Sequence, residues 1–148
     1  MEKVLLLNGP NLNLLGQRRR DIYSTQTLEE IENELKDFFL KYNIELVSFQ
    51  SNHEGELIDQ LHRANQECVG VIFNPGAYTH TSIALHDAIE AINIPVVEVH
   101  ISNIHKRESF RSKSFIAPVA IGQISGFGPL SYLTAAFALI QYLKKEGE

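Results

Sequence analysis

The chain has 148 residues, of which 44% are hydrophobic and 21% are charged, and its formal net charge is −5. This length and composition predict one ordinary globular domain over residues 1–148, and the acidic balance argues against nucleic-acid binding through unspecific charge. Cys68 is the only cysteine, which excludes an internal disulfide, and no apolar run is long enough to span a membrane, so we expect a cytoplasmic enzyme or binding module.

Strand and helix patterns alternate along the chain. Short apolar runs that end in Gly, Pro or Asn predict strands, and apolar residues at helical spacing predict helices between them. Residues 27–30 have the capping-box pattern, and Pro129 suits the start of a last helix. In chain order we predict a strand over 3–8, a helix over 28–39, a strand over 45–50, a helix over 55–66, a strand over 69–73, a helix over 80–92, strands over 95–100 and 119–125, and a helix after 129. The expected apolar face of the last helix consists of Leu133, Ala136, Phe137, Ile140 and Leu143.

This alternation predicts a doubly wound α/β domain, with a five-stranded parallel sheet in the flavodoxin-like order and helices on both faces. In such sheets, ligands bind beyond the carboxyl ends of the strands. Segments rich in amides, hydroxyls and imidazoles follow four of the predicted strands, at 8–11, 50–53, 74–76 and 100–102. We therefore expect a pocket there for a ligand with many hydroxyl groups.

Glu98 and His100 lie at the end of the fourth predicted strand. Side chains two residues apart share a face of a strand, so these two should point the same way, with Ser102 near them. A carboxylate beside an imidazole fixes its tautomer, as a general acid or base requires. The alternative is a histidine at a strand end that only makes hydrogen bonds.

A long segment, 11–23, separates the first strand from the first helix, and loops of this length are usually functional or disordered. It carries Arg18, Arg19 and Arg20 close to Tyr23. A nearby guanidinium favours the phenolate form of a tyrosine and brings it closer to use as a base. The alternative is a solvated basic loop in which Tyr23 packs against its neighbours.

Arg107 and Arg111 would lie one turn apart on a helix, and arginine forks suit carboxylates and phosphates. The alternative is surface pairing with Glu108. His86 and Asp87 are compatible with ordinary exposed helix positions.

Metal binding is not favoured by the histidine pattern. Glu98, His100 and His80 could supply ligands, but the sequence has neither HExxH nor paired cysteines.

Four motifs together resemble one known family, the type II 3-dehydroquinate dehydratases. They are Asn-Gly-Pro-Asn-Leu-Asn-Leu-Leu-Gly at 8–16, Gln-Ser-Asn-His-Glu-Gly at 50–55, Asn-Pro-Gly-Ala at 74–77 with Thr-His-Thr-Ser at 79–82, and Glu-Val-His-Ile-Ser-Asn at 98–103. The resemblance runs nearly end to end. It implies a flavodoxin-like lyase that removes water from 3-dehydroquinate to give 3-dehydroshikimate through an enolate, in the shikimate pathway or in quinate breakdown. It also implies that the enzyme uses neither metal nor organic cofactor.

The resemblance implies a catalytic role for five residues. Tyr23 matches the base that takes a proton from the carbon next to the ketone, and Arg18 matches the arginine that sustains its phenolate. Asn11 matches the amide that helps to hold the enolate through a water. His100 matches the acid that protonates the departing hydroxyl, and Glu98 orients it.

The resemblance also implies how the substrate is bound. Asn74, His80 and Arg111 match residues that bind its hydroxyls and ring, and Ile101 and Ser102 match the pair that binds its carboxylate.

The family assembles as a dodecamer of trimers, which implies a homo-oligomer here. Asp87 matches an acidic residue that completes the site from a neighbouring subunit. Neither a nucleic acid nor a membrane is an expected partner.

The sequence departs from the family in the loop that carries Tyr23. An acid and a proline usually follow the position of Arg18, and glycine follows the tyrosine, whereas this chain has Arg19, Arg20 and Ser24. Loss of a proline and a glycine leaves the open loop more conformations and makes closure harder. We expect this effect to outweigh the added positive charge.

Non-catalytic readings of the same fold remain as alternatives. A carrier of FMN would have a phosphate loop rich in Ser and Thr after the first strand, but 11–16 is mostly Asn and Leu. A phospho-receiver would have acids after the first and third strands, where this chain has Asn8 and Asn74. A scaffold protein with an altered loop is the remaining alternative.

Overall fold

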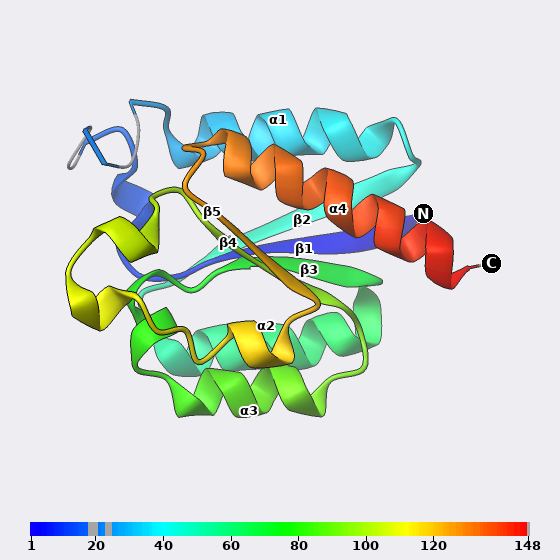
Figure 1. The fold of residues 1–148 in the computed structure, drawn as a ribbon. Helices are drawn as coiled ribbons and strands as arrows, with labels where there is room; N and C mark the ends of the chain where they lie inside the picture. Colours follow the sequence, from blue (N-terminus) through cyan, green and yellow to red (C-terminus); the bar gives the residue numbers. More distant parts are fainter. Residues whose placement is uncertain (18–20, 23–24, 148) are drawn as a thin grey trace.

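The computed structural model describes residues 1–17, 21–22 and 25–147. Its five strands form one parallel sheet in the order β2-β1-β3-β4-β5 (Figure 1), which confirms the predicted flavodoxin-like order. The strands are β1 Glu2–Asn8, β2 Ile44–Gln50, β3 Gly70–Asn74, β4 Val96–His100 and β5 Gly122–Ser125.

Helices cover both faces of the sheet (Figure 1). Alternation along β1 explains the two layers: Val4 and Leu6 belong to one apolar core, while Leu5 and Leu7 belong to the other. The first core packs under α1 Leu28–Leu40 and α4 Leu130–Glu146, and the second under α2 Glu54–Glu67 and α3 Ile83–Ala91. None of the helices in the described part of the chain is long and apolar enough to cross a lipid bilayer.

Helix caps explain where two of the helices begin. The Thr27 hydroxyl accepts a hydrogen bond from the Glu30 amide at 3.2 Å, as the capping-box pattern predicts. The predicted start of the third helix at His80 is wrong. Ser82 caps that helix by accepting from the Leu85 amide at 2.9 Å, and residues Gly76–His80 form a separate 3-10 turn, η2. His80 is therefore held in a turn beyond the end of β3.

The last strand begins later than predicted, at Gly122 instead of 119. Residues Ala117–Val119 form a 3-10 turn, η5, that contains a proline. The Ser114 hydroxyl accepts hydrogen bonds from the amides of Ile116 and Ala117, which closes this turn. Two further short turns, η3 Ile104–Lys106 and η4 Ser109–Arg111, lie between β4 and this segment.

The predicted apolar face of α4 is only partly correct. Ala136 and Ile140 are buried, but Phe137 is exposed, and Leu133 is only partly buried. The face that packs on the sheet also contains residues that the periodicity did not select, which are Ser131, Tyr132, Ala135 and Leu139. Apolar residues lie on most sides of this helix up to Leu143, so its sequence pattern does not single out the buried face.

Candidate active site

A pocket of about 110 Å³ lies beyond the carboxyl ends of β1, β3 and β4. Most of its lining follows directly from a strand end, as expected for a doubly wound sheet. Its lining residues are Pro10, Asn11, Leu12, Asn74, Gly76, Ala77, His80, His100, Ile101, Ser102, Ile104, Arg107 and Arg111. The structure thus brings together seven of the predicted site residues: Asn11, Asn74, His80, His100, Ile101, Ser102 and Arg111.

Glu98 and His100 form a buried pair at the end of β4. The distance from Glu98 Oε2 to His100 Nε2 is 2.5 Å, and the two residues are 0% and 5% exposed. Because a carboxylate only accepts hydrogen bonds, we assign the proton to His100 Nε2. The other ring nitrogen, Nδ1, is then left for a ligand in the pocket.

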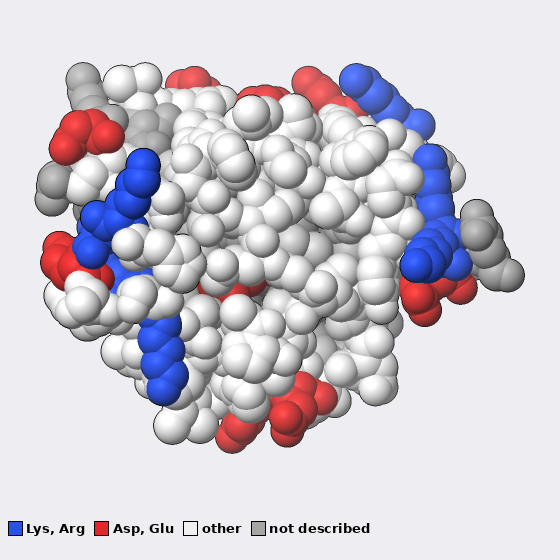
Figure 2. Space-filling view, viewed as in Figure 1, with Lys and Arg blue, Asp and Glu red and all other residues white. Residues whose placement is uncertain are grey.

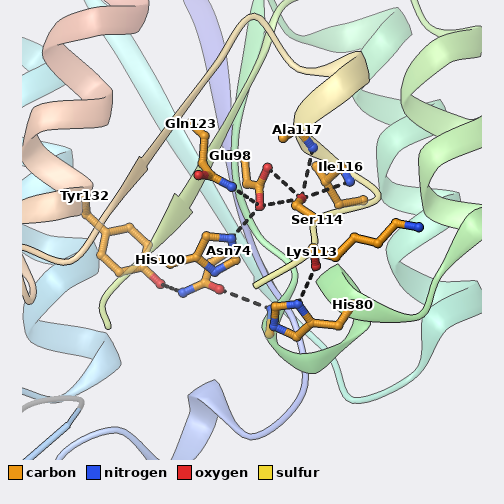
Figure 3. A network of polar contacts seen from close by, with 11 residues as sticks. Asn74, His80, Glu98, His100, Lys113, Ser114, Ile116, Ala117, Gln123 and Tyr132 are labelled. Carbon is orange, nitrogen blue, oxygen red and sulfur yellow. Dashed lines mark hydrogen bonds and ion pairs between the residues drawn. The ribbon is translucent and has the colours of Figure 1, made fainter. Parts of the chain in front are cut away.

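The Glu98 carboxylate has two other partners, which sequence patterns did not identify (Figure 3). The Ser114 hydroxyl donates to both carboxylate oxygens at 3.0 and 2.9 Å, and Gln123 Nε2 donates to Oε2 at 3.0 Å. The one local signal was the glutamate itself, since a carboxylate within a buried strand requires hydrogen-bond donors.

Asn74, at the end of β3, is held by a buried chain of hydrogen bonds (Figure 3). Its Nδ2 donates to the Tyr132 hydroxyl at 2.9 Å, which in turn donates to Asn8 Oδ1 at 2.6 Å. Its Oδ1 accepts from the Gly76 amide at 3.1 Å. Burial raises the pKa of Tyr132 well above its usual range, so the phenol keeps its proton and remains a donor. The sequence pattern did not predict the role of Tyr132.

His80 is oriented by a backbone carbonyl. Its Nδ1 lies 2.7 Å from the Lys113 carbonyl oxygen, which can only accept, so Nδ1 carries the proton and Nε2 is an acceptor. Burial lowers the pKa of His80, and the nearby His100 and Arg111 act in the same direction, although the Lys113 carbonyl opposes them. His80 is therefore suited to accept a hydrogen bond from a ligand hydroxyl.

Two arginines line the pocket from the segment after β4. Arg111 Nε donates to Glu108 Oε2 at 2.7 Å, and Arg111 also lines the pocket. Both alternatives for this residue are therefore correct. Arg107 Nη1 contacts the Ser102 hydroxyl at 3.4 Å. Arg107 follows η3 in extended conformation and Arg111 ends η4, so the two do not share a helix, but both reach the same pocket.

The polar residues at the end of β2 and just after it support the pocket without lining it. Asn52 Oδ1 accepts from the Asn11 amide at 3.0 Å, and Gln50 Nε2 donates to the Gly9 carbonyl at 3.1 Å. Gly9 is required because a Cβ there would collide with the Pro75 carbonyl. Asn11 takes up a left-handed conformation with φ of 70°.

Two of the predicted site residues in the described part of the chain, Glu98 and Asp87, are not among the pocket lining. Asp87 lies on α3 with its side chain 69% exposed and its carboxylate 3.2 Å from His86 Nδ1. Arg18 and Tyr23 lie outside the described residues, as do Arg19, Arg20 and Ser24. Among residues 1–17, 21–22 and 25–147, no group of three or more His, Cys, Asp or Glu side chains could hold a metal ion.

Known proteins match this chain over nearly its whole length. A protein of Caldicellulosiruptor bescii named 3-dehydroquinate dehydratase is 56% identical over 144 residues, which cover 97% of this chain and 99% of that protein. A protein of Anoxybacillus flavithermus with the same name is 53% identical over 148 residues and covers both chains completely. The crystal structure of a type II dehydroquinase from Butyrivibrio crossotus has a TM-score of 0.91 and 44% identity, over 93% of this chain and 97% of that one. Residues 2–140 match the family described as dehydroquinase class II, and the chain belongs to that family.

Proposed function

We propose that this protein is a hydro-lyase that removes water from 3-dehydroquinate to give 3-dehydroshikimate. The observation that carries the proposal is the buried Glu98–His100 pair at the edge of a polar pocket. Family membership and the shared name of the relatives support the same reaction.

The reaction requires one base and one acid. The base breaks a C–H bond next to the ketone and leaves an enolate, which then expels the hydroxyl from the neighbouring carbon. The acid gives that hydroxyl a proton, so that it departs as water and a conjugated enone remains. General acid–base catalysis of this kind contributes about 10²- to 10⁴-fold to the rate.

His100 is proposed as the acid. Its Nε2–H is bound to Glu98, which leaves Nδ1 as the atom that delivers a proton to the departing hydroxyl. The Glu98 carboxylate keeps the ring in this orientation, as a general acid requires.

Tyr23 is proposed as the base, with Arg18 sustaining its phenolate. Both assignments rest on the sequence motif alone. Asn11 follows β1 at the pocket wall and is proposed to help hold the enolate through a water.

The lining of the pocket fits a polyhydroxylated acid. Asn74, with its orientation fixed by Tyr132, and His80, with an acceptor at Nε2, are proposed to bind ring hydroxyls. Arg111 and the backbone amides of Ile101 and Ser102 are proposed to bracket the carboxylate.

The proposed assembly is a dodecamer of trimers in the cytoplasm. In it, the exposed carboxylate of Asp87 would complete the site of a neighbouring subunit. Asp87 does not line the pocket of its own chain, so its proposed role is in the pocket of another subunit.

The test is turnover of 3-dehydroquinate by the purified protein, followed by the ultraviolet absorbance of the conjugated product. We expect saturable formation of the enone. A well-folded protein that forms no enone would overturn the proposal and favour the scaffold alternative, and a protein with bound flavin would show it by its visible colour.

A further inference from the structure

The Glu98 carboxylate lies where an unsupported charge would be very costly. Glu98 is 0% exposed, and its neighbours along β4, Val97 and Val99, are 2% and 0% exposed. A carboxylate in such surroundings stays charged only when donors replace its lost hydration. The donors that surround it therefore determine both its charge and its direction.

Ser114 has only one direction in which to donate. Its Oγ accepts hydrogen bonds from the amides of Ile116 and Ala117, each at 3.0 Å, which occupies both of its acceptor positions. Its single proton then points at Glu98, with both carboxylate oxygens within 3.0 Å (Figure 3). The hydroxyl cannot rotate away without breaking the η5 turn.

Gln123 reaches Glu98 from the adjacent strand. The register pairs Glu98 with Gln123, so the two side chains stand side by side on β4 and β5, and Gln123 Nε2 donates at 3.0 Å. All three partners of the carboxylate are donors, namely His100, Ser114 and Gln123. Ser114 and Gln123 therefore hold the carboxylate oxygens in place beside the imidazole.

The segment that carries Ser114 also holds the second histidine of the pocket. The Lys113 carbonyl accepts from His80 Nδ1 at 2.7 Å, and the Phe115 amide donates to the Thr79 carbonyl at 2.9 Å. Residues 113–115 thus join η2 to β4. The position of Ser114 is fixed from both sides.

We propose that Ser114 and Gln123 are positioning residues, which lock the Glu98 carboxylate against His100 Nε2 and so present His100 Nδ1 to the departing hydroxyl. Neither side chain lines the pocket, and both act through Glu98. Without either donor the carboxylate can turn, and the imidazole is then less well placed for proton transfer. The kinetic part of this inference rests on the proposed dehydration.

The first test compares kcat with KM in single variants. Gln123→Met and Ser114→Ala should each lower kcat by about ten- to a hundredfold, the range for one lost hydrogen bond to a charged group. KM and the Kd of a quinate-like inhibitor should change by less than about threefold, because the loss falls on the transition state. Ser114→Thr keeps the hydroxyl and should restore most of kcat.

Two comparisons separate positioning from folding. Ser112→Ala is the matched control, because the exposed Ser112 hydroxyl donates to the Ser109 carbonyl in the neighbouring turn, and this variant should keep the wild-type kcat. In a His100→Ala background, Gln123→Met should lower kcat no further, since it acts through His100. A full additional loss in that background, or an unchanged kcat in Gln123→Met, would overturn the proposal.

A proton NMR measurement tests the positioning without any turnover. The His100 Nε2 proton, in a 2.5 Å hydrogen bond to a buried carboxylate, should give a low-field resonance in the wild type and in Ser112→Ala. It should move upfield or be lost by exchange in Gln123→Met and Ser114→Ala. An unchanged resonance in both variants contradicts the proposal. A resonance that responds as expected in a protein without turnover leaves the positioning intact and shows that the proposed reaction is wrong.

Discussion

The two histidines of the pocket, His80 and His100, differ in the partner that each ring contacts, and this difference suits them to different roles. His80 Nδ1–H donates to the Lys113 carbonyl, which leaves Nε2 as an acceptor, while His100 Nε2–H donates to the Glu98 carboxylate, which leaves Nδ1 facing the pocket. Burial lowers the pKa of His80, so that ring is neutral at neutral pH. A neutral acceptor beside a proton donor suits a substrate with several hydroxyl groups.

The lowered pKa of His80 predicts that both the stability of the protein and inhibitor binding weaken at acid pH. The unfolded chain takes up the proton near the ordinary value of 6.5, whereas folded His80 takes it up only at lower pH. Its contribution to stability is therefore complete above 6.5 and is lost as the pH falls through the lower, folded value. Protonation at Nε2 also removes the acceptor, so the Kd of a quinate-like inhibitor should rise over the same range.

The check is inhibitor binding and thermal unfolding of the wild type and His80→Gln between pH 7.5 and about pH 5, around the reference value for histidine. The variant cannot titrate at this position, so both curves should flatten. Identical pH dependence in the two proteins would show that another group is responsible.

Local sequence pattern identified the Glu98–His100 pair because period-two alternation is a property of the strand itself. It could not identify Ser114 or Gln123, which lie 16 and 25 residues from Glu98 and meet it only through the turns after β4 and the register of β5. The sequence also offered two alternatives for Arg111, a surface pair with Glu108 or a pocket residue. The structure shows that the side chain does both.

At the scale of elements, one hydroxyl on α4 connects two strand ends. Tyr132 comes from the helix, Asn8 ends β1 and Asn74 ends β3, and all three are buried. A residue of α4, Tyr132, therefore fixes the orientation of the Asn74 side-chain amide in the pocket. Periodicity did not select Tyr132, because α4 is apolar on most sides.

Removal of that hydroxyl should be costly. Tyr132→Phe leaves Asn8 Oδ1 and Asn74 Nδ2 without their partner in the interior, which should lower the free energy of unfolding by about 1–3 kcal/mol. KM for 3-dehydroquinate should rise, since Asn74 loses its fixed orientation. Chemical denaturation and steady-state kinetics measure the two effects.

Tyr142→Phe, on the more accessible end of the same helix, is the matched control and should stay within about 0.5 kcal/mol of the wild type. Equal stability of the two variants would mean that the buried chain of hydrogen bonds contributes nothing.

At the scale of the whole molecule, charge is distributed unevenly. On the face shown in Figure 2, which carries α4 and β5, most charged side chains lie around the rim, and apart from a small patch of acidic atoms the centre is uncharged. Four large apolar side chains of this region are exposed, which are Ile121, Phe127, Leu130 and Phe137. Apolar patches of this kind mark surfaces that other proteins cover.

This surface fits the proposed homo-oligomer. Analytical ultracentrifugation should give a wild-type mass near twelve times the 16.7 kDa of one chain. Phe137→Glu, which places a charge at an exposed apolar position, should favour smaller species, whereas Glu90→Gln on α3 should not. A monomeric wild type at micromolar concentration would contradict the proposed assembly and the role of Asp87 in a neighbouring site.

The fold was predictable at this scale because apolar runs with period two and helical spacing recur in regular order, and this order allows few topologies. Interfaces with other chains are not predictable in the same way. The exposed residues of α4 follow the same spacing as buried ones, and only the packed structure separates the two sets.

The most direct test of the central claim is the effect of His100→Ala on turnover and on binding, measured side by side. We expect kcat for 3-dehydroquinate to fall by at least about a hundredfold, the usual scale for a general acid, while the Kd of a quinate-like inhibitor changes far less. A variant that keeps its kcat and loses inhibitor binding would show that His100 only binds the substrate and that the Glu98–His100 pair is not the acid of the dehydration.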